Sequence, residues 1–427
     1  MVLRLCSRYY GEVDTVTNLN SSTPAPTRER LAIVDILRGF ALFGILVVNI
    51  TTFRSGNPAW SGIEWVVDRL TLALAQGKFV LVYSFLFGLG FALQLEHAAD
   101  RPYMARYFRR LLGLLLLGIA HFVLLWEGDI LLSYVLPGLL LLLFARRRPQ
   151  TALKWGFGLY AAYLGLILVI VTAQALHGPA ATPAATAAAV EPGSVPPALL
   201  LTSSYGELVS TRWRILPDFL SEHSLGAIFA LGIFLLGFYA GRQRLLSDSE
   251  NHLPLLRRVF AGGLALGLVT APAYVFISFY QKSLVLRLRL LGFVAAFTSP
   301  IALCLAYVAA MTLAAPALVR RLPWLAAGMQ AAGRMSLTNY LMQSLILTTL
   351  FYGYGLGWYG RVAPVAGVAL AGVIYAGQLV FSFFWLRVFR FGPVEWLWRS
   401  LTYWRVQPMR VALSTLLIHK GVTKYDN

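Results

Sequence analysis

The chain has 427 residues, of which 58% are hydrophobic and only 13% are charged. Charged residues make up about a quarter of an average soluble domain, so this composition excludes an ordinary soluble fold and predicts a membrane protein. The net charge of +18 does not predict a nucleic-acid-binding protein, because the basic residues stand in short runs between apolar segments and form no single patch.

The N-terminal region, residues 1–29, is polar and contains the linker-like stretch NLNSSTPAPT. It lacks the apolar core of a cleavable signal peptide, so we expect a disordered cytoplasmic extension followed by an uncleaved first span. Cys6 and Cys304 are too few for a disulfide framework or a thiolate metal site.

A helix needs about 20 mainly apolar residues to cross a bilayer. Ten segments meet this requirement in whole or in part, which predicts an all-α polytopic membrane protein with both termini in the cytoplasm. The segments are 31–53, 78–95, 111–126, 129–144, 155–176, 224–241, 259–279, 290–314, 335–354 and 362–386. This assignment places most of the 36 Lys and Arg residues on the cytoplasmic side, as the positive-inside rule requires. The loop 281–289 disagrees, because it carries three basic residues on the outer side.

The spans divide the chain into five parts. The predicted outer loop, residues 177–223, begins with an Ala/Pro-rich stretch that cannot bury a core. Its second half alternates apolar and polar residues like an interfacial helix. We detect no repeat that relates the two halves of the chain and no clearly broken helix. The parts are the extension 1–29, a five-helix membrane part 30–176 that contains the candidate site, the outer loop 177–223, a C-terminal membrane part 224–405 and a basic cytoplasmic tail 406–427.

The first span contains Asp35 and Arg38, which are three residues apart and therefore share a helical face on which they can pair. A charge in lipid costs about 2.5–3.5 kcal/mol on insertion scales, so the pair must face the protein interior or a cavity. Such a pair indicates either a binding site or an ion pair that locks helices together.

The third span contains His121, and the tight WEGD turn that follows it contains Glu127 and Asp129. His121 lies ten residues into the segment 111–126, about 15 Å from its start. Histidine is the side chain best suited to exchange protons near neutral pH, and either acid could orient it. The alternatives are a histidine that only satisfies a structural hydrogen bond and acids that are solvated in the turn.

Other polar residues are candidates for substrate binding. Lys78 opens the second span, and its alternative role is to extend to the membrane interface. The segment 333–345, GRMSLTNYLMQSL, predicts a polar helical face that needs partners or a water-filled cavity. Its polar members are Arg334, Ser336, Asn339, Tyr340 and Gln343. The segment 391–399, FGPVEWLWR, predicts an interfacial helix that begins at Pro393.

Five motifs, in order from about residue 30 to 405, resemble the YeiB-like bacterial membrane proteins, whose C-terminal part is catalogued as domain of unknown function 418. The motifs are VDILRGFALFGILVVNI, GKFVLVYSFLFGLGF, GIAHFVLLWEGDILLSYVLPGLL, GRMSLTNYLMQSLI and FRFGPVEWLWRSLTYW. The resemblance implies a multi-pass protein of the bacterial inner membrane.

The first-span pattern, an Asp followed three residues later by Arg-Gly, is also similar to that of the transmembrane acyltransferases, including the heparan-α-glucosaminide N-acetyltransferases. Those proteins move an acyl group from cytoplasmic acyl-CoA to an acceptor on the other face of the membrane. The lysosomal relative has a reactive histidine shortly after its first span, where this chain has NPAWSG with Asn57. The role of His121 therefore rests on its own surroundings.

These observations predict an acyltransferase that uses acyl-CoA, with acetyl-CoA as the expected donor, and no metal, because no ligand cluster has suitable spacing. His121 is the expected base, with Asp129 or Glu127 as its orienting partner, and Arg38, held by Asp35, is expected to meet the donor. The acceptor is a glycan, a lipid-linked sugar or a small molecule. The remaining candidates for binding are Lys78, Arg334, Asn339, Tyr340 and Gln343.

The alternative prediction is a proton-coupled transporter of a small solute. In that reading the Asp35–Arg38 pair is a gate, and His121, Glu127 and Asp129 form a proton relay. Membrane lipid is the expected surrounding in both readings, nucleic acid is not an expected partner, and a homodimer is left open.

Overall fold

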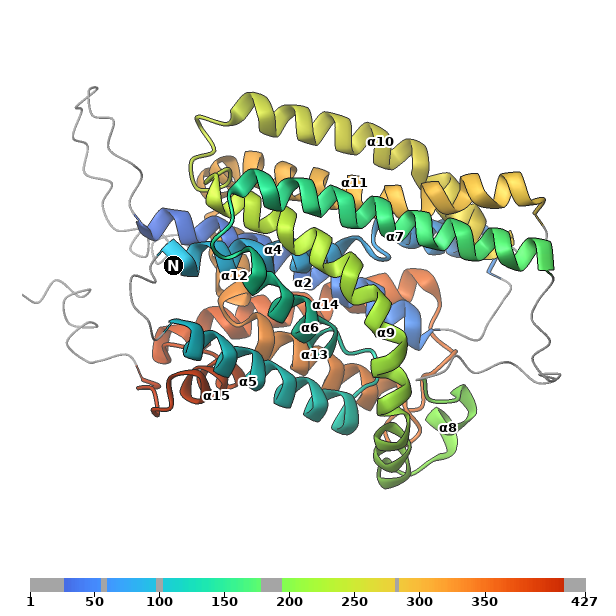
Figure 1. Cartoon of the computed structure of the whole chain (residues 1–427). Coiled ribbons are helices and arrows are strands. Elements are labelled where there is room, and N and C mark those ends of the chain that lie inside the picture. The colour runs from blue at the N-terminus through green and yellow to red at the C-terminus, as the bar shows by residue number, and fades with distance from the viewer. Residues whose placement is uncertain (1–26, 55–59, 97–102, 178–193, 281–283, 411–427) are drawn as a thin grey trace, which may run out of the picture.

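In a computed structural model of the chain, residues 27–54, 60–96, 103–177, 194–280 and 284–410 are described, and nearly all of them are helical (Figure 1). The one bridge between extended residues in this part of the chain joins Phe389 and Arg410. The helices are α2 (Thr27–Phe53), α3 (Gly62–Leu74), α4 (Lys78–Glu96), α5 (Tyr103–Leu124), α6 (Leu131–Leu141), the 3-10 turn η1 (Leu142–Phe144), α7 (Pro149–His177), α8 (Pro197–Thr202), α9 (Tyr205–Arg242), α10 (Leu253–Tyr280), α11 (Leu286–Arg321), α12 (Pro323–Arg334), α13 (Ser336–Phe351), α14 (Pro364–Val388) and α15 (Pro393–Tyr403).

The fold is that of an all-α polytopic membrane protein. Within the described residues, seven helical segments are long and apolar enough to cross a membrane, and α9, which bends by 68°, brings the number to eight. Two of the ten predicted spans fall short of this length, because 129–144 corresponds to the 11-residue α6 with η1 and 335–354 to the 16-residue α13. In α7 only 6% of the apolar window is buried inside the protein, which indicates that this helix faces lipid.

Two helices were not predicted from the sequence, and each is joined to the next helix by a short interruption. α3 is separated from α4 by the residues 75–77, where Gly77 adopts a φ of +78°. α12 ends one residue before α13 begins, and the intervening Met335 has the non-helical dihedrals φ −109° and ψ 30°. The expectation that no helix is clearly broken is wrong for α9, whose two parts are bent by 68°.

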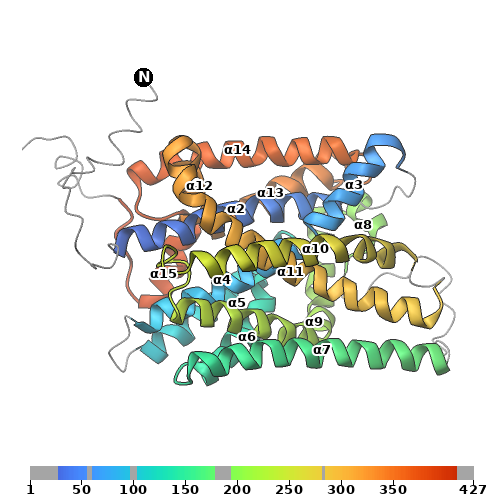
Figure 2. The ribbon, with the colours of Figure 1, turned by 90° about the horizontal axis from the view of Figure 1, so that it is seen from above.

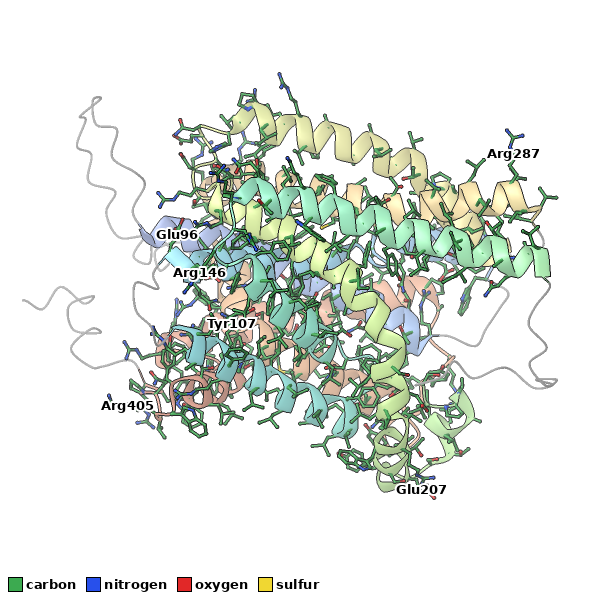
Figure 3. All side chains as sticks on the ribbon, viewed as in Figure 1. Glu96, Tyr107, Arg146, Glu207, Arg287 and Arg405 are labelled. Carbon is green, nitrogen blue, oxygen red and sulfur yellow. The ribbon has the colours of Figure 1, made fainter. Side chains whose placement is uncertain are left out.

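The bundle has two ends that differ in charge. Figure 3 shows Glu96, Arg146 and Arg405 at one end and Arg287 at the other. We call the first the basic end, because Arg146, which opens the run RRR at 146–148, and Arg405 both lie there. Seen from above, α14 and α7 lie at opposite edges of the bundle, with α2, α4 and α9 between them (Figure 2).

The largest buried apolar cluster joins α2, α4 and α9. α4 and α9 approach each other so closely that a Cβ atom at Gly88 would overlap the carbonyl oxygen of Phe234, and one at Gly237 would overlap the carbonyl oxygen of Phe85. The two glycines therefore bring backbone against backbone, which is how small residues pack helices in a membrane.

A side chain at Gly237 is expected to force α4 and α9 apart. We predict that Gly237→Ala lowers the free energy of unfolding by roughly 1–3 kcal/mol, because the added methyl group must displace backbone. Thermal unfolding in detergent measures the effect. The control is Gly372→Ala on α14, where a Cβ atom meets nothing within 4 Å. Equal melting temperatures for the two variants would contradict the proposed contact.

Candidate functional site

His121 lies in the last turn of α5, and its side chain is buried. Its carbonyl oxygen accepts hydrogen bonds from the amides of Leu125 and Trp126, which close the turn after the helix. α5 begins at Tyr103, so His121 lies about 27 Å along the helix from its first residue. The predicted depth of about 15 Å is too small, because the helix begins eight residues earlier than the predicted span.

Both ring nitrogens of His121 have buried partners. Nδ1 lies 2.6 Å from Oδ2 of Asp129, and Nε2 lies 2.8 Å from Oγ of Ser344. The other carboxylate oxygen of Asp129 accepts a hydrogen bond of 2.6 Å from the amide of Leu132, in the first turn of α6. The α5–α6 turn thus supplies one partner of the imidazole and α13 supplies the other.

The order Asp129–His121–Ser344 has a direct chemical consequence. A carboxylate accepts the Nδ1 proton, which leaves Nε2 as the acceptor for the Ser344 hydroxyl. A hydroxyl that faces a base which is itself oriented by an acid is the arrangement of an activated nucleophile. The buried surroundings strengthen these electrostatic contacts.

Ser344 was missed by the sequence analysis, although a signal for it exists. It follows the predicted candidate Tyr340 by four residues and therefore lies on the same face of α13. Ser344 is inside the predicted polar segment 333–345, directly after the candidate Gln343, but it was not counted among the polar members of that segment. The sequence could not predict that Ser344 pairs with His121, because 223 residues separate the two along the chain.

Tyr340 fixes the turn that carries Asp129. Its hydroxyl donates to the carbonyl oxygen of Gly128 at 3.1 Å and accepts from the amide of Ile130 at 3.4 Å. Its ring centroid lies 5.0 Å from that of His121. Tyr340 therefore contacts the imidazole and also holds the residues on either side of Asp129.

Of the two acids in the turn, Asp129 alone contacts the imidazole in this structure. Glu127 instead accepts a hydrogen bond of 3.0 Å from Nε of Arg212 on α9. The option that Glu127 orients His121 is therefore not supported by the geometry. The Arg212 side chain is fully buried, a location that the sequence did not predict.

Asn339 and Gln343 face α14 rather than His121. Nδ2 of Asn339 donates to Ser382 at 2.9 Å, Nε2 of Gln343 donates to Gln378 at 2.8 Å, and Gln378 donates back to the Asn339 carbonyl oxygen at 2.9 Å. These bonds join α13 to α14. The predicted polar face thus contacts two neighbouring parts of the protein, α14 through Asn339 and Gln343 and the α5–α6 turn through Tyr340.

Asp35 and Arg38 form the predicted pair, with 3.0 Å between Oδ1 and Nη1. The Arg38 side chain is 31% exposed, so it can be reached by a ligand. Arg334 and Arg399 lie close enough to act electrostatically on the Asp35 carboxylate, and both are exposed. We call Arg38, which pairs with Asp35, together with Arg334 and Arg399, which lie within electrostatic reach of the same carboxylate, the arginine cluster.

Lys78 does not extend to the membrane interface, and that expectation is wrong. Its side chain is fully buried, Nζ donates to the Leu72 carbonyl oxygen at 3.1 Å and the ammonium lies 3.8 Å from the centre of the Tyr274 ring. Leu72 is in the last turn of α3, so Lys78 occupies the break between α3 and α4 and binds a carbonyl that the break leaves free.

The imidazole is enclosed by protein. One hollow on the protein surface is lined by Lys154, Trp155 and Leu159 of α7. A smaller hollow is lined by residues that include Val34 and Leu89. His121 lines neither of these two hollows. Within the described residues, no three His, Cys, Asp or Glu side chains are grouped as metal ligands would be.

Glu395 positions the beginning of α13. α15 begins at Pro393, as predicted, and the buried Glu395 carboxylate accepts hydrogen bonds from the amides of Leu337 (2.7 Å) and Thr338 (3.0 Å) and from the Thr338 hydroxyl (2.5 Å). Burial raises the pKa of Glu395 above its ordinary value, and the hydrogen bonds from Thr338 and Leu337 oppose this rise. The carboxylate thus caps α13, the helix that carries Ser344.

Loss of this cap is expected to destabilise the protein. We predict that Glu395→Ala lowers the free energy of unfolding by about 0.5–2 kcal/mol, because two helix amides lose their acceptor. Glu395→Gln keeps an acceptor oxygen for both amides and should stay close to the wild-type melting temperature. A Glu395→Gln variant as unstable as Glu395→Ala would show that the charge, and not the cap, matters.

The fold and the site define an all-α polytopic membrane protein with a buried Asp–His–Ser arrangement. The chain belongs to the DUF418 family, since the profile described as "Protein of unknown function (DUF418)" matches residues 240–405 and long relatives align over nearly the whole chain. The chain is 34% identical to "Uncharacterized protein YxaH" of Bacillus subtilis (strain 168), over 92% of this chain and 98% of that protein. It is 32% identical to "Uncharacterized protein YeiB" of Escherichia coli (strain K12), over 88% and 96%. Ser344 lies inside the matched profile, whereas His121 and Asp129 precede it.

Proposed function

We propose that this protein is a membrane-embedded acyltransferase of the bacterial inner membrane. It moves an acyl group, with acetyl as the expected one, from cytoplasmic acyl-CoA to an acceptor at the outer side. The observation that supports this proposal is the buried chain of contacts from Asp129 through His121 to Ser344. Nucleophile, base and orienting acid are the parts that covalent acyl transfer requires.

In the first step, Ser344 Oγ attacks the thioester carbonyl carbon and its proton passes to Nε2 of His121. The tetrahedral intermediate collapses, the carbon–sulfur bond breaks, and the CoA thiolate takes the proton from His121. The products are CoA thiol and an ester on Ser344. Asp129 stabilises the imidazolium that exists during the step.

In the second step, a hydroxyl or amine of the acceptor gives its proton to His121 and attacks the ester carbonyl carbon. The bond to Ser344 Oγ breaks, and Oγ takes the proton back from His121. The enzyme returns to its starting state with no net proton uptake. A covalent intermediate lets donor and acceptor react at different times, which suits substrates that arrive from opposite sides.

The arginine cluster is the proposed site for the donor phosphates, because arginine binds phosphate with paired hydrogen bonds. The cluster is near the start of α13, since a Cβ atom at Gly333 would overlap the Asp35 carbonyl oxygen. Ser344 lies about 12 Å further along α13 than its first residue, Ser336. The extended pantetheine arm of CoA is long enough to bring a thioester from the cluster toward Ser344.

Removal of the nucleophile or the base is the main test. We predict that Ser344→Ala and His121→Ala lower CoA release from labelled acetyl-CoA, measured in nanodiscs, by roughly 10³-fold or more. Without acceptor, the wild type should release one equivalent of CoA and keep the label on a peptide that contains Ser344. The control is Ser299→Ala, which removes another fully buried serine that bonds the Gly267 carbonyl oxygen. Unchanged CoA release in a folded His121→Ala variant would overturn the proposal, and unchanged release in Ser344→Ala alone would exclude the covalent intermediate.

The donor site has a separate test. We predict that Arg334→Gln raises the KM for acetyl-CoA by roughly 10-fold and leaves kcat nearly unchanged, because a charged hydrogen bond to phosphate is lost far from the reacting atoms. Arg287→Gln is the matched control, since Arg287 lies at the opposite end of the bundle (Figure 3). An equal KM in both variants would contradict a donor site at the arginine cluster.

Proton-coupled transport is the second candidate, and the broken helices favour it. Transporters often place breaks such as those at 75–77 and Met335 beside a substrate path. In this reading Asp35–Arg38 is the gate and His121 with Asp129 carries protons. Solute uptake into vesicles without any turnover of acyl-CoA would favour transport, whereas CoA release that requires Ser344 would favour acyl transfer.

A further inference from the structure

Arg212 is a buried cation with unused hydrogen-bonding capacity. Its Nε donates to Glu127, but Nη1 and Nη2 are buried and have no hydrogen-bond partner. The hydroxyl of Tyr352 is buried and has no close hydrogen-bond partner either; its nearest charged neighbour is the Arg212 guanidinium, which lies 5.5 Å from the centre of the Tyr352 ring and interacts with the hydroxyl electrostatically. Buried donors without partners are costly, and a charged donor is the costliest kind. These groups therefore point to a polar ligand that completes their hydrogen bonds.

The local charge limits what this ligand is. The positive charge of Arg212 is already balanced by Glu127, which lies 3.0 Å away. An anionic ligand would leave a net negative charge in a buried place, which is unfavourable. A neutral group with several oxygen atoms meets the requirement, because its oxygens accept from Nη1, Nη2 and the Tyr352 hydroxyl while its own hydroxyls donate to the Glu127 carboxylate.

The position of these groups connects them to the reaction. Glu127 and Asp129 are in the same turn, where the Asp129 amide donates to the Glu127 carbonyl oxygen at 2.8 Å. Arg212 is thus bonded to the turn that also carries Asp129, the partner of the His121 imidazole, and this turn follows the end of α5 that is far from its first residue, Tyr103. The donor is expected to arrive from the basic end, so this side is free for the acceptor.

Aromatic side chains surround the same place. Tyr354 packs edge-to-face on Tyr352 at 5.9 Å and on Tyr205 at 5.6 Å, and Tyr205 donates to the Leu124 carbonyl oxygen, next to the α5–α6 turn. Tyr205 and Tyr354 are 45% and 37% exposed. An exposed aromatic ring offers an apolar face with a polar edge. A sugar ring has the matching pattern, with carbon-bound hydrogens on its face and hydroxyls at its edge.

We infer that Arg212, Glu127 and Tyr352 form the acceptor subsite and that the acceptor carries a neutral, hydroxyl-rich group such as an uncharged glycosyl unit. This inference rests on the acyltransferase function proposed above for the role of the ligand as acceptor. The binding site itself is tested without acyl transfer.

The test measures binding as a ligand-induced rise in melting temperature of the full chain in nanodiscs. The probes are methyl glucoside, which is neutral, and methyl glucuronide, which carries a carboxylate. We expect methyl glucoside to stabilise the wild type more than methyl glucuronide does. Tyr352→Phe should weaken the binding of methyl glucoside by about 5- to 10-fold, because it removes one hydroxyl and keeps the ring. Tyr160→Phe, which removes a hydroxyl that bonds Thr298 between α7 and α11, is the matched control.

A charge variant makes the test sharper. Glu127→Gln leaves Arg212 without its counter-charge, so this variant should prefer methyl glucuronide over methyl glucoside. A wild type that neither sugar stabilises, or that prefers methyl glucuronide, would overturn the inferred subsite, and so would unchanged glucoside binding in Tyr352→Phe. If the wild type binds methyl glucoside as expected but does not turn over acyl-CoA, the proposed acyltransferase function would be overturned and the sugar-binding site would stand.

Discussion

The arrangement of this protein depends on one buried imidazole with two nitrogens that both need polar partners. A buried polar group without a hydrogen bond costs free energy, so His121 must meet one partner on each side of its ring. Asp129 comes from the neighbouring turn, and Ser344 comes from a helix 223 residues further along the chain. The requirement therefore fixes the α5–α6 hairpin against α13, and the two hydrogen bonds of Tyr340 to the same turn reinforce this contact.

α13 is held in place along its whole length because it carries the distant partner. Glu395 caps its first turn, Asn339 and Gln343 bind α14 through its middle, and Phe351 is buried at its end. The helix has only 16 residues, so it is too short for a full span and cannot rely on lipid-facing apolar surface alone. Polar contacts to α15, to α14 and to the α5–α6 hairpin therefore hold the helix in place.

Two groups of charged residues lie on either side of Ser344. The arginine cluster gathers positive charge near the start of α13, where Arg38 is exposed enough to meet a ligand. Arg212 and Glu127 form a charge-balanced pair beside the α5–α6 turn. Ser344 lies between the two places, and the imidazole beside it is enclosed by protein. The backbone departs from helical dihedrals at Gly77, between α3 and α4, and at Met335, between α12 and α13.

The sequence by itself determined what depends on residues that are close along the chain. Apolar runs gave the membrane class, the i,i+3 spacing gave the Asp35–Arg38 pair, and the short WEGD turn gave the α5–α6 hairpin. The tertiary structure decided which distant groups meet. Ser344 as the partner of His121, Arg212 as the partner of Glu127 and the burial of Lys78 follow from how helices pack, and helical periodicity states only which face a residue occupies, not what lies opposite that face.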